Sequence, residues 1–161
     1  MASSLVFQHD VFISYQWDIK KQVETIHEKL EADGKLKVWR DIHLVSNNDG
    51  LYKQLATQIE HSRIFLCFLT KKYCKSGNCL KELIFADKSK KTIIYLMIER
   101  MTTEELTNEI SFIMGQSLYI QCYNSPASWW IDYFNEIKKS IETNLKVNCV
   151  FFGRVKSSFI C

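Results

Sequence analysis

Apolar runs alternate with amphipathic stretches along most of the chain, which is the pattern of an α/β protein. The short apolar runs predict five strands, at residues 11–15, 37–40, 64–69, 92–98 and 117–121. Apolar residues at helical spacing between them predict helices over 19–33, 51–59, 79–88, 104–114 and 128–145. Because strands and helices alternate, we expect a parallel sheet with right-handed crossovers and helices on both faces.

The run Ile64–Leu69 is apolar at every position, which is typical of a strand in the middle of a parallel sheet. In open sheets of this kind, ligands bind beyond the carboxyl ends of the strands. That rule selects three polar or turn-rich loops, at residues 15–18, 41–50 and 70–78. Glu82 lies on the helix that leaves the third loop, so we expect it near the binding site.

The 161 residues fit one domain, which we place at 1–145, followed by an apolar tail at 146–161. We expect the tail to pack on the domain. Whether it does so as an extra strand or instead mediates contacts stays open at this point. The net charge of +3 is too small to indicate a nucleic-acid partner. The chain contains no membrane-length apolar run and begins with no signal peptide, so we expect a cytoplasmic protein.

Six cysteines raise the question of disulfides or a metal site. Without a secretory signal, free thiols are the default. Cys74 and Cys79 are separated by four residues, but no second close pair and no His-x-x-x-His follows them. The four histidines show no ligand spacing either. We therefore expect no metal site.

Three segments in order resemble a known family. They are Asp10–Tyr15 (DVFISY), Val38–Asp41 (VWRD) with the loop to Gly50, and Ser76–Leu83 (SGNCLKEL). Together they are similar to the Toll/interleukin-1 receptor (TIR) domain family, and the third resembles its plant and invertebrate, enzyme-like form. The resemblance covers roughly residues 8–142. It implies a flavodoxin-like three-layer fold with five parallel strands in the order 2-1-3-4-5.

The resemblance also implies one of two functions. Many TIR domains are adaptors that assemble with other TIR domains, and others cleave NAD⁺ at the nicotinamide glycosidic bond, some cyclising the ADP-ribose. The enzymes carry a glutamate early in the third helix, which corresponds here to Glu82. A carboxylate at that place can stabilise the oxocarbenium-like ribose left when nicotinamide departs. NAD⁺ is then the substrate, and no cofactor is expected.

The same resemblance places substrate-binding residues in the three loops. We expect them to be Tyr15, Gln16, Trp17, Asp41, Gly50, Leu51, Tyr52 and Asn78. The chain departs from the enzymatic pattern in two of these loops. Asn78 stands where a tryptophan is common, and is available to cap the helix or to bond the ribose. Gln16 and Trp17 stand where arginines are common, so Lys20, Lys21 or Lys53 is the candidate cation for the diphosphate.

Each of the main candidates also has a plain structural reading. Glu82 can also be read as a charge on a solvated helix surface, paired with Lys81 or Lys88. A negative charge there would stabilise the N-terminus of the helix. Trp17 can supply an aromatic surface for a base or simply pack on the first helix. Tyr52 can stack on nicotinamide or lie half-buried in the turn that begins its helix.

Other functions of this fold class are excluded by the loops themselves. A phospho-accepting receiver domain needs an aspartate after the third strand, where this chain has Thr70-Lys71-Lys72. A flavodoxin-type phosphate loop needs small residues where Tyr15–Trp17 stands. The resemblance to TIR domains then implies an NAD⁺-cleaving enzyme activated by self-association in innate-immune or cell-death signalling. The alternative is a non-enzymatic TIR adaptor that acts through homotypic contacts. Both readings make other TIR domains the expected partners.

Overall fold

The computed structural model describes residues 6–41 and 50–156, with backbone alone for 148–156. Five parallel strands form one sheet in the order β2-β1-β3-β4-β5. Their bounds are β1 (His9–Ser14), β2 (Val38–Trp39), β3 (Ser62–Leu69), β4 (Thr92–Met97) and β5 (Tyr119–Gln121). The predicted flavodoxin-like fold and its strand order are confirmed.

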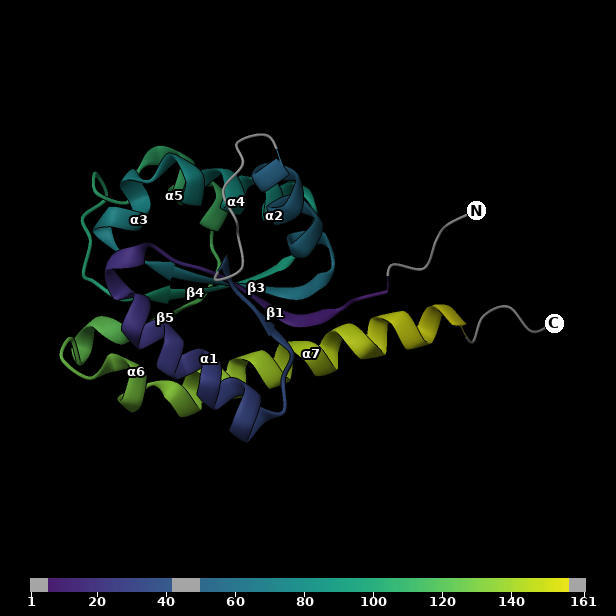
Figure 1. Ribbon diagram of the computed structural model, residues 1–161. Helices are drawn as coiled ribbons and strands as arrows, with labels where there is room; N and C mark the ends of the chain where they lie inside the picture. Colours follow the sequence, from purple (N-terminus) through teal and green to yellow (C-terminus); the bar gives the residue numbers. More distant parts are fainter. Residues whose placement is uncertain (1–5, 42–49, 157–161) are drawn as a thin grey trace.

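Helices cover both faces of the sheet and give the domain three layers (Figure 1). One face carries α1 (Lys20–Gly34), α6 (Trp129–Asp132) and α7 (Phe134–Lys156). The other face carries α2 (Gly50–Glu60), α3 (Lys71–Lys75), α4 (Gly77–Lys88) and α5 (Asn108–Met114). Short 3-10 turns, η1 (Trp17–Ile19) and η3 (Cys122–Asn124), follow the first and fifth strands.

The central strand β3 explains why its sequence is apolar throughout. Its side chains alternate between the two helical layers, as the twofold period of a strand requires. Those that face α1 and α7 are Ile64, Leu66 and Phe68. Those that face α2 and α4 are Phe65, Cys67 and Leu69. All six are fully buried, so no polar position is available to produce an alternating pattern.

The third predicted loop, residues 70–78, contains a helix that the sequence analysis missed. Thr70 caps this five-residue helix, α3, by accepting a hydrogen bond from the backbone N–H of Tyr73 at 3.0 Å. Ser76 then caps α4, accepting from the N–H of Cys79 at 3.3 Å. Helix α4 therefore begins at Gly77, two residues before the predicted start. Asn78, expected to be a possible cap, lies inside the first turn instead.

The C-terminal region differs from its prediction in two ways. The helix expected over 128–145 is two helices, interrupted at Tyr133, and α7 continues to Lys156. The chain through 156 is therefore helical, and no extra strand forms there. Figure 1 shows the last turns of α7 extending past the sheet. The packing expected for the 146–161 tail lies largely outside the described residues.

The helix predicted over 104–114 is shorter than expected. It begins at Asn108, after Thr107, whose side chain accepts from the N–H of Ile110 at 3.5 Å. Residues 103–107 are turns. Across the described part of the chain, no helix combines the length and apolar character needed to cross a membrane.

Candidate active site

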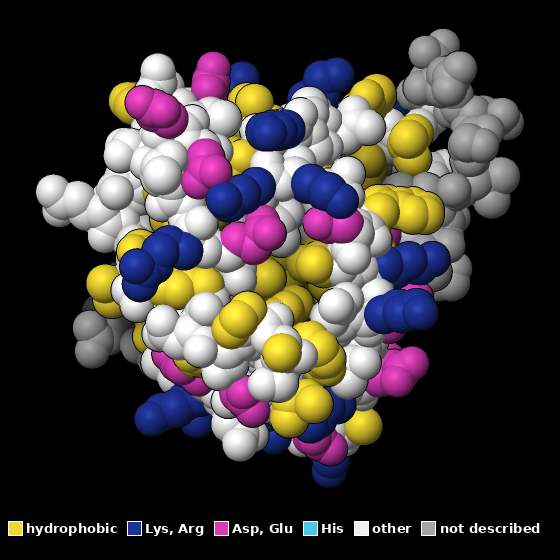
Figure 2. All heavy atoms as spheres, turned by 90° about the vertical axis from the view of Figure 1, so that its left-hand side faces the viewer, with side chains coloured by type: hydrophobic (Ala, Val, Ile, Leu, Met, Phe, Trp, Pro, Cys, Tyr) yellow, Lys and Arg dark blue, Asp and Glu magenta, His cyan; other side chains and the backbone are white. Residues whose placement is uncertain are grey.

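A cavity of about 440 Å³ opens at the carboxyl edge of the sheet, beyond β1, β2 and β3. Its lining comprises Tyr15, Gln16, Trp17, Lys20, Asp41, Leu51, Tyr52, Leu55, Ser76, Asn78, Cys79 and Glu82. Figure 2 views this edge and shows apolar side chains gathered in the middle, with basic and acidic ones around them. The rule for open parallel sheets therefore located the cavity correctly.

One wall of the cavity is built around Asp41. Its carboxylate accepts hydrogen bonds from the Tyr15 hydroxyl at 3.0 Å and from Trp17 Nε1 at 3.2 Å. Burial and the neighbouring Asp41 charge raise the pKa of Tyr15 to about 12, so the phenol keeps its proton. Trp17 is 63% exposed, and Lys20 Nζ lies 5.0 Å from the centre of its ring. Trp17 thus presents an aromatic surface beside a cation.

Buried contacts hold Asp41 in place from behind. Arg40, the residue before it, is buried and donates from Nε to His27 Nδ1 at 2.8 Å. Its guanidinium also lies 3.4 Å from the carboxylate of Glu24. Both partners belong to α1. These contacts fix the end of β2 to α1 at the residue before Asp41, which accepts the hydrogen bonds from Tyr15 and Trp17.

The opposite wall joins α2 to α4. The Tyr52 hydroxyl donates to Asn78 Oδ1 at 2.8 Å, and Lys81 Nζ lies 4.7 Å from the centre of the Tyr52 ring. A second, largely apolar cavity of about 370 Å³ adjoins the first between these helices. Tyr52, Leu55 and Glu82 line both cavities. Asn78 therefore bonds a tyrosine of this chain, at a position where the family resemblance led us to expect contact with ribose.

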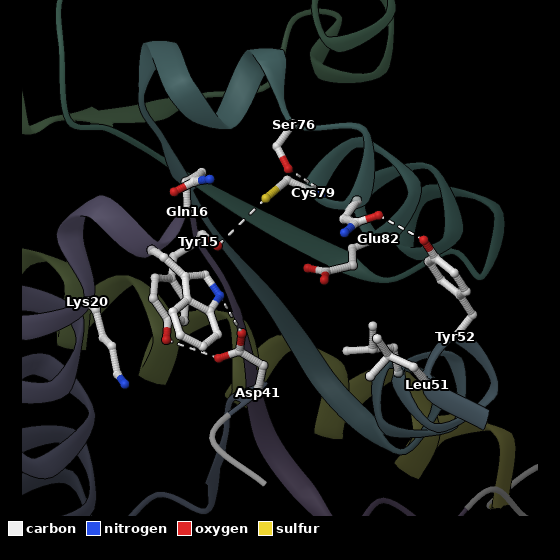
Figure 3. A pocket seen from close by; sticks show the side chains of 12 residues that line it. Tyr15, Gln16, Lys20, Asp41, Leu51, Tyr52, Ser76, Cys79 and Glu82 are labelled. Carbon is white, nitrogen blue, oxygen red and sulfur yellow. Dashed lines mark hydrogen bonds between the residues drawn. The ribbon is translucent and has the colours of Figure 1, made fainter. Parts of the chain in front are cut away.

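Glu82 points into the cavity between these two walls (Figure 3). It is partly buried, and its Oε2 accepts a hydrogen bond from Ser14 Oγ at 2.6 Å. Burial raises its pKa from 4.5 to about 7; the Ser14 hydrogen bond opposes this rise and the Asp41 charge adds to it. Both protonation states of Glu82 are therefore populated near neutral pH. A carboxylate poised in this way is suited to proton transfer.

The thiol in the cavity is not a candidate nucleophile. Cys79 Sγ lies 3.6 Å from the backbone oxygen of Tyr15, and burial raises the pKa of its thiol to about 12. The thiolate form is therefore scarce at neutral pH. The four described cysteines, Cys67, Cys74, Cys79 and Cys122, are buried free thiols. Among the described residues, no group of three His, Cys, Asp or Glu side chains is arranged to hold a metal ion.

Of the nine residues predicted for catalysis and substrate binding, the structure brings eight together around the cavity, all except Gly50. Gly50 begins α2 and lies away from the main cavity, beside a smaller one between α2 side chains. The rest of the predicted loop before Gly50, residues 42–49, lies outside the described residues. Ser14, which bonds Glu82, was missed as a functional residue although it belongs to the first matching segment. Of the three candidate lysines, Lys20 lines the cavity.

The structure separates the two readings of Glu82 and is compatible with both readings of Trp17 and of Tyr52. Glu82 is bonded to Ser14 rather than displayed as a solvated charge, while Lys81 lies over Tyr52 and Lys88 is exposed. Trp17 is largely exposed, and its ring lies beside Lys20 at the start of α1, which fits either of its readings. Tyr52 lies in the first turn of α2, 45% exposed and lining the cavity, which likewise fits either of its readings.

Comparison with protein families identifies the fold's relatives. A family model described as TIR domain matches residues 11–141, more than three quarters of the chain. The chain belongs to the TIR domain family. The matched span includes both walls of the cavity and Glu82. No curated protein sequence matches the chain significantly.

Solved structures of low sequence identity share the fold of this TIR domain. The TIR domain of the Toll-related receptor TRR-2 from Hydra magnipapillata has a TM-score of 0.60 and 19% identity, covering 81% of this chain and 99% of its own. TIR domains of the activated Roq1 resistosome, which recognises the pathogen effector XopQ, score 0.51 at 18% identity, covering 82% and 84%. A prokaryotic SEFIR domain scores 0.60 at 18% identity, covering 83% and 99%.

Proposed function

We propose that this TIR domain is an NAD⁺ glycohydrolase of the enzyme-like branch of its family, with Glu82 as the catalytic residue. The observation that carries the proposal is the Glu82 carboxylate itself. It is partly buried, accepts a hydrogen bond at 2.6 Å, and points into a cavity of about 440 Å³ that is lined by aromatic and polar groups. The resemblance of the segment around Glu82 to enzymatic TIR domains supports the same assignment.

The chemistry requires little more than one carboxylate. The bond between ribose C1′ and the nicotinamide nitrogen breaks, and its electron pair stays with nicotinamide, which leaves as a neutral molecule without needing an acid. The positive charge that develops on the ribose is stabilised by ionised Glu82. Water then bonds to C1′ and gives its proton to Glu82, which releases it to solvent. The products are ADP-ribose, nicotinamide and a proton. If an adenine nitrogen attacks C1′ instead of water, a cyclic product forms.

The walls of the cavity offer complementary surfaces to the rest of NAD⁺. Lys20 is the cation that the described residues supply to the lining, and it is suited to the diphosphate. The exposed Trp17 ring beside it is suited to stacking on a nucleobase. On the other side, Leu51, Tyr52 and the adjoining apolar cavity favour a neutral aromatic product. We assign nicotinamide to that side.

TIR domains generally interact with other TIR domains, and we propose that self-association activates this one. In the family, the loop after the second strand usually joins neighbouring subunits, and here that loop begins at the Asp41 wall of the cavity. Assembly can thereby complete the site across two subunits, and a dilute monomer would then show low activity. Activity that rises more steeply than in proportion to protein concentration is the corresponding signature.

A non-enzymatic adaptor is the second candidate function. The observation that favours it is the content of the cavity, where Asn78 is bonded to Tyr52 and a single lysine stands in place of the arginines that are common in enzymatic relatives. Both functions involve homotypic assembly, so oligomeric state does not separate them. Cleavage of NAD⁺ separates them, because only the enzyme releases nicotinamide.

The proposal is tested by comparing NAD⁺ with NADH at high protein concentration. Cleavage at the glycosidic bond needs the pyridinium of NAD⁺ as leaving group, whereas a diphosphate-cleaving contaminant consumes both dinucleotides. We expect chromatography to show free nicotinamide released from NAD⁺, with NADH unchanged. If folded, assembled protein releases no nicotinamide, the adaptor is the function that remains. Equal consumption of NAD⁺ and NADH without free nicotinamide would indicate a contaminant.

Replacing Lys20 tests the placement of the diphosphate. We expect Lys20→Ala to raise KM for NAD⁺ by roughly five- to tenfold with kcat nearly unchanged, because the interaction is present before and during the reaction. Lys21→Ala is the matched control, since that side chain is exposed and lies outside the cavity lining. Equal effects of the two substitutions on KM would contradict a specific contact.

A further inference from the structure

Glu82 is the end of a chain of hydrogen bonds that reaches into the protein interior. Ser14 Oγ lies 2.6 Å from Glu82 Oε2 and 2.9 Å from the hydroxyl oxygen of Tyr73. The Tyr73 hydroxyl in turn lies 3.3 Å from the backbone oxygen of Cys79, to which it donates. The chain thus runs from the carboxylate, through two hydroxyl groups, to a fixed backbone acceptor.

The two hydroxyl groups are held rigidly. Ser14 is the last residue of β1, a strand flanked by β2 and β3, and is 1% exposed. Tyr73 is 0% exposed and comes from α3, the short helix capped by Thr70. Buried hydroxyls need hydrogen-bond partners, and here each has one on either side. Neither side chain lines the cavity, so both act on substrate through Glu82.

The donor-to-acceptor direction of these hydrogen bonds can reverse without moving any heavy atom. When Glu82 is ionised, Ser14 donates to it and can accept the single Tyr73 hydroxyl proton, which then turns away from the Cys79 backbone oxygen. When Glu82 is protonated, its hydroxyl can donate to Ser14, which donates to Tyr73, which donates to the Cys79 backbone oxygen. Each hydroxyl group donates one proton and accepts one hydrogen bond in that second arrangement. Both protonation states of Glu82 are therefore accommodated in one geometry.

From this arrangement we infer that Ser14 and Tyr73 are positioning residues that hold Glu82 toward the cavity and let it gain and lose a proton in place. The inference rests on the proposed function, in which Glu82 takes a proton from the attacking water. Ser14 stabilises the ionised form before attack. The full chain, ending at the Cys79 backbone oxygen, stabilises the protonated form after it.

Other ionisable groups around Glu82 set the background for its titration. They are Tyr15 after β1, Lys20 on α1, Asp41 after β2, Tyr52 and Lys53 on α2, Cys67 on β3, Tyr73 on α3, and Cys79 and Lys81 on α4. Burial raises the pKa of Cys67, Tyr73 and Cys79, so these three stay neutral. The Asp41 charge adds to the rise in the Glu82 pKa, and the Ser14 hydrogen bond opposes it.

Two substitutions should therefore move the titration of Glu82 in opposite directions. Ser14→Ala removes the donor to the carboxylate, so the pKa of Glu82 should rise by roughly one to two pH units. Tyr73→Phe removes a partner of Ser14 in both states. The ionised form keeps the direct Ser14 donor to its carboxylate, whereas the protonated form leaves the Ser14 proton without an acceptor, which costs more. The pKa should then fall below its wild-type value of about 7. A purely structural role would not produce opposite signs.

The experiment follows Glu82 directly by NMR in protein carrying ¹³C at the glutamate side-chain carboxyls. The Glu82 resonance is assigned by its loss in Glu82→Gln, and its midpoint is measured in wild type, Ser14→Ala and Tyr73→Phe. Opposite shifts would support the inference. An unchanged midpoint in both variants, or a shift in the same direction in both, would overturn it. Tyr73→Phe is nearly isosteric and tests the inference even where Ser14→Ala fails to fold.

The kinetic counterpart separates this inference from the proposed function. In an active enzyme, the pH at which kcat/KM reaches half of its maximum should move upward in Ser14→Ala and downward in Tyr73→Phe. At pH 7, Ser14→Ala should then lose roughly tenfold in kcat/KM and recover it at higher pH. The NMR titration needs no turnover. An inactive wild type would refute the proposed function. The carboxyl titration would still decide whether the hydrogen bonds through Ser14 and Tyr73 control the pKa of Glu82.

Discussion

Glu82→Gln is expected to lower the rate of nicotinamide release from NAD⁺ by roughly 10²–10³-fold, the usual loss when one preorganised electrostatic contact to a transition state is removed. Glutamine has the shape of glutamate, and its side-chain oxygen can still accept the hydrogen bond from Ser14. What it lacks is the negative charge opposite the developing oxocarbenium and the ability to take a proton from water. The loss should therefore appear in kcat rather than in KM.

The matched control is Glu28→Gln, which removes a carboxylate from an exposed position on α1. Its rate should equal that of wild type. Initial rates are measured at pH 7 and equal protein concentration, with circular dichroism confirming the fold of each variant. Retention of most of the activity by Glu82→Gln would show that the carboxylate does not perform the chemistry.

The same substitution is expected to stabilise the folded protein at alkaline pH. The pKa of Glu82 is about 7 in the folded state, against 4.5 as its ordinary value. The folded state therefore binds the proton more tightly than the unfolded state, and the free energy of unfolding falls as pH rises between these two values. Above pH 7 the cost of keeping Glu82 ionised is roughly 3 kcal/mol. Glutamine does not incur it.

Urea unfolding at pH 4 and pH 8 measures this effect. The difference in unfolding free energy between Glu82→Gln and wild type should grow by up to about 3 kcal/mol from the lower to the higher pH. Glu28→Gln should follow wild type at both pH values. A constant difference between Glu82→Gln and wild type would show that Glu82 has the same pKa in the folded and unfolded states. A catalytic carboxylate that costs stability is typical of functional sites.

Much of the fold could be read from the sequence because its determinants are local and repeated. The run Ile64–Leu69 is buried on both faces, and the helix over residues 20–34 buries a regular apolar stripe. The elements that were predicted wrongly lack such a repeated pattern. Helix α3 spans five residues, too few for a period to appear, and is fixed by the Thr70 cap and the buried Tyr73.

The candidate site was predictable in part because it lies where a parallel sheet places its ligands. Residues from three separate loops, including Trp17, Asp41 and Asn78, meet around one cavity as that rule requires. The sequence could not show which side chains would be hydrogen-bonded to each other. Nothing in the spacing indicates that Ser14 bonds Glu82 across 68 positions, or that Asn78 bonds Tyr52. Those contacts depend on tertiary geometry.

The most direct test of this account is a side-by-side assay of nicotinamide release from NAD⁺ by wild type and Glu82→Gln. Both are assayed at pH 7 and at a protein concentration at which each is shown to self-associate. The account predicts that wild type releases nicotinamide in amounts equal to the NAD⁺ consumed, while the variant releases roughly 10²–10³-fold less. No release by assembled wild type, or equal release by both, would contradict it.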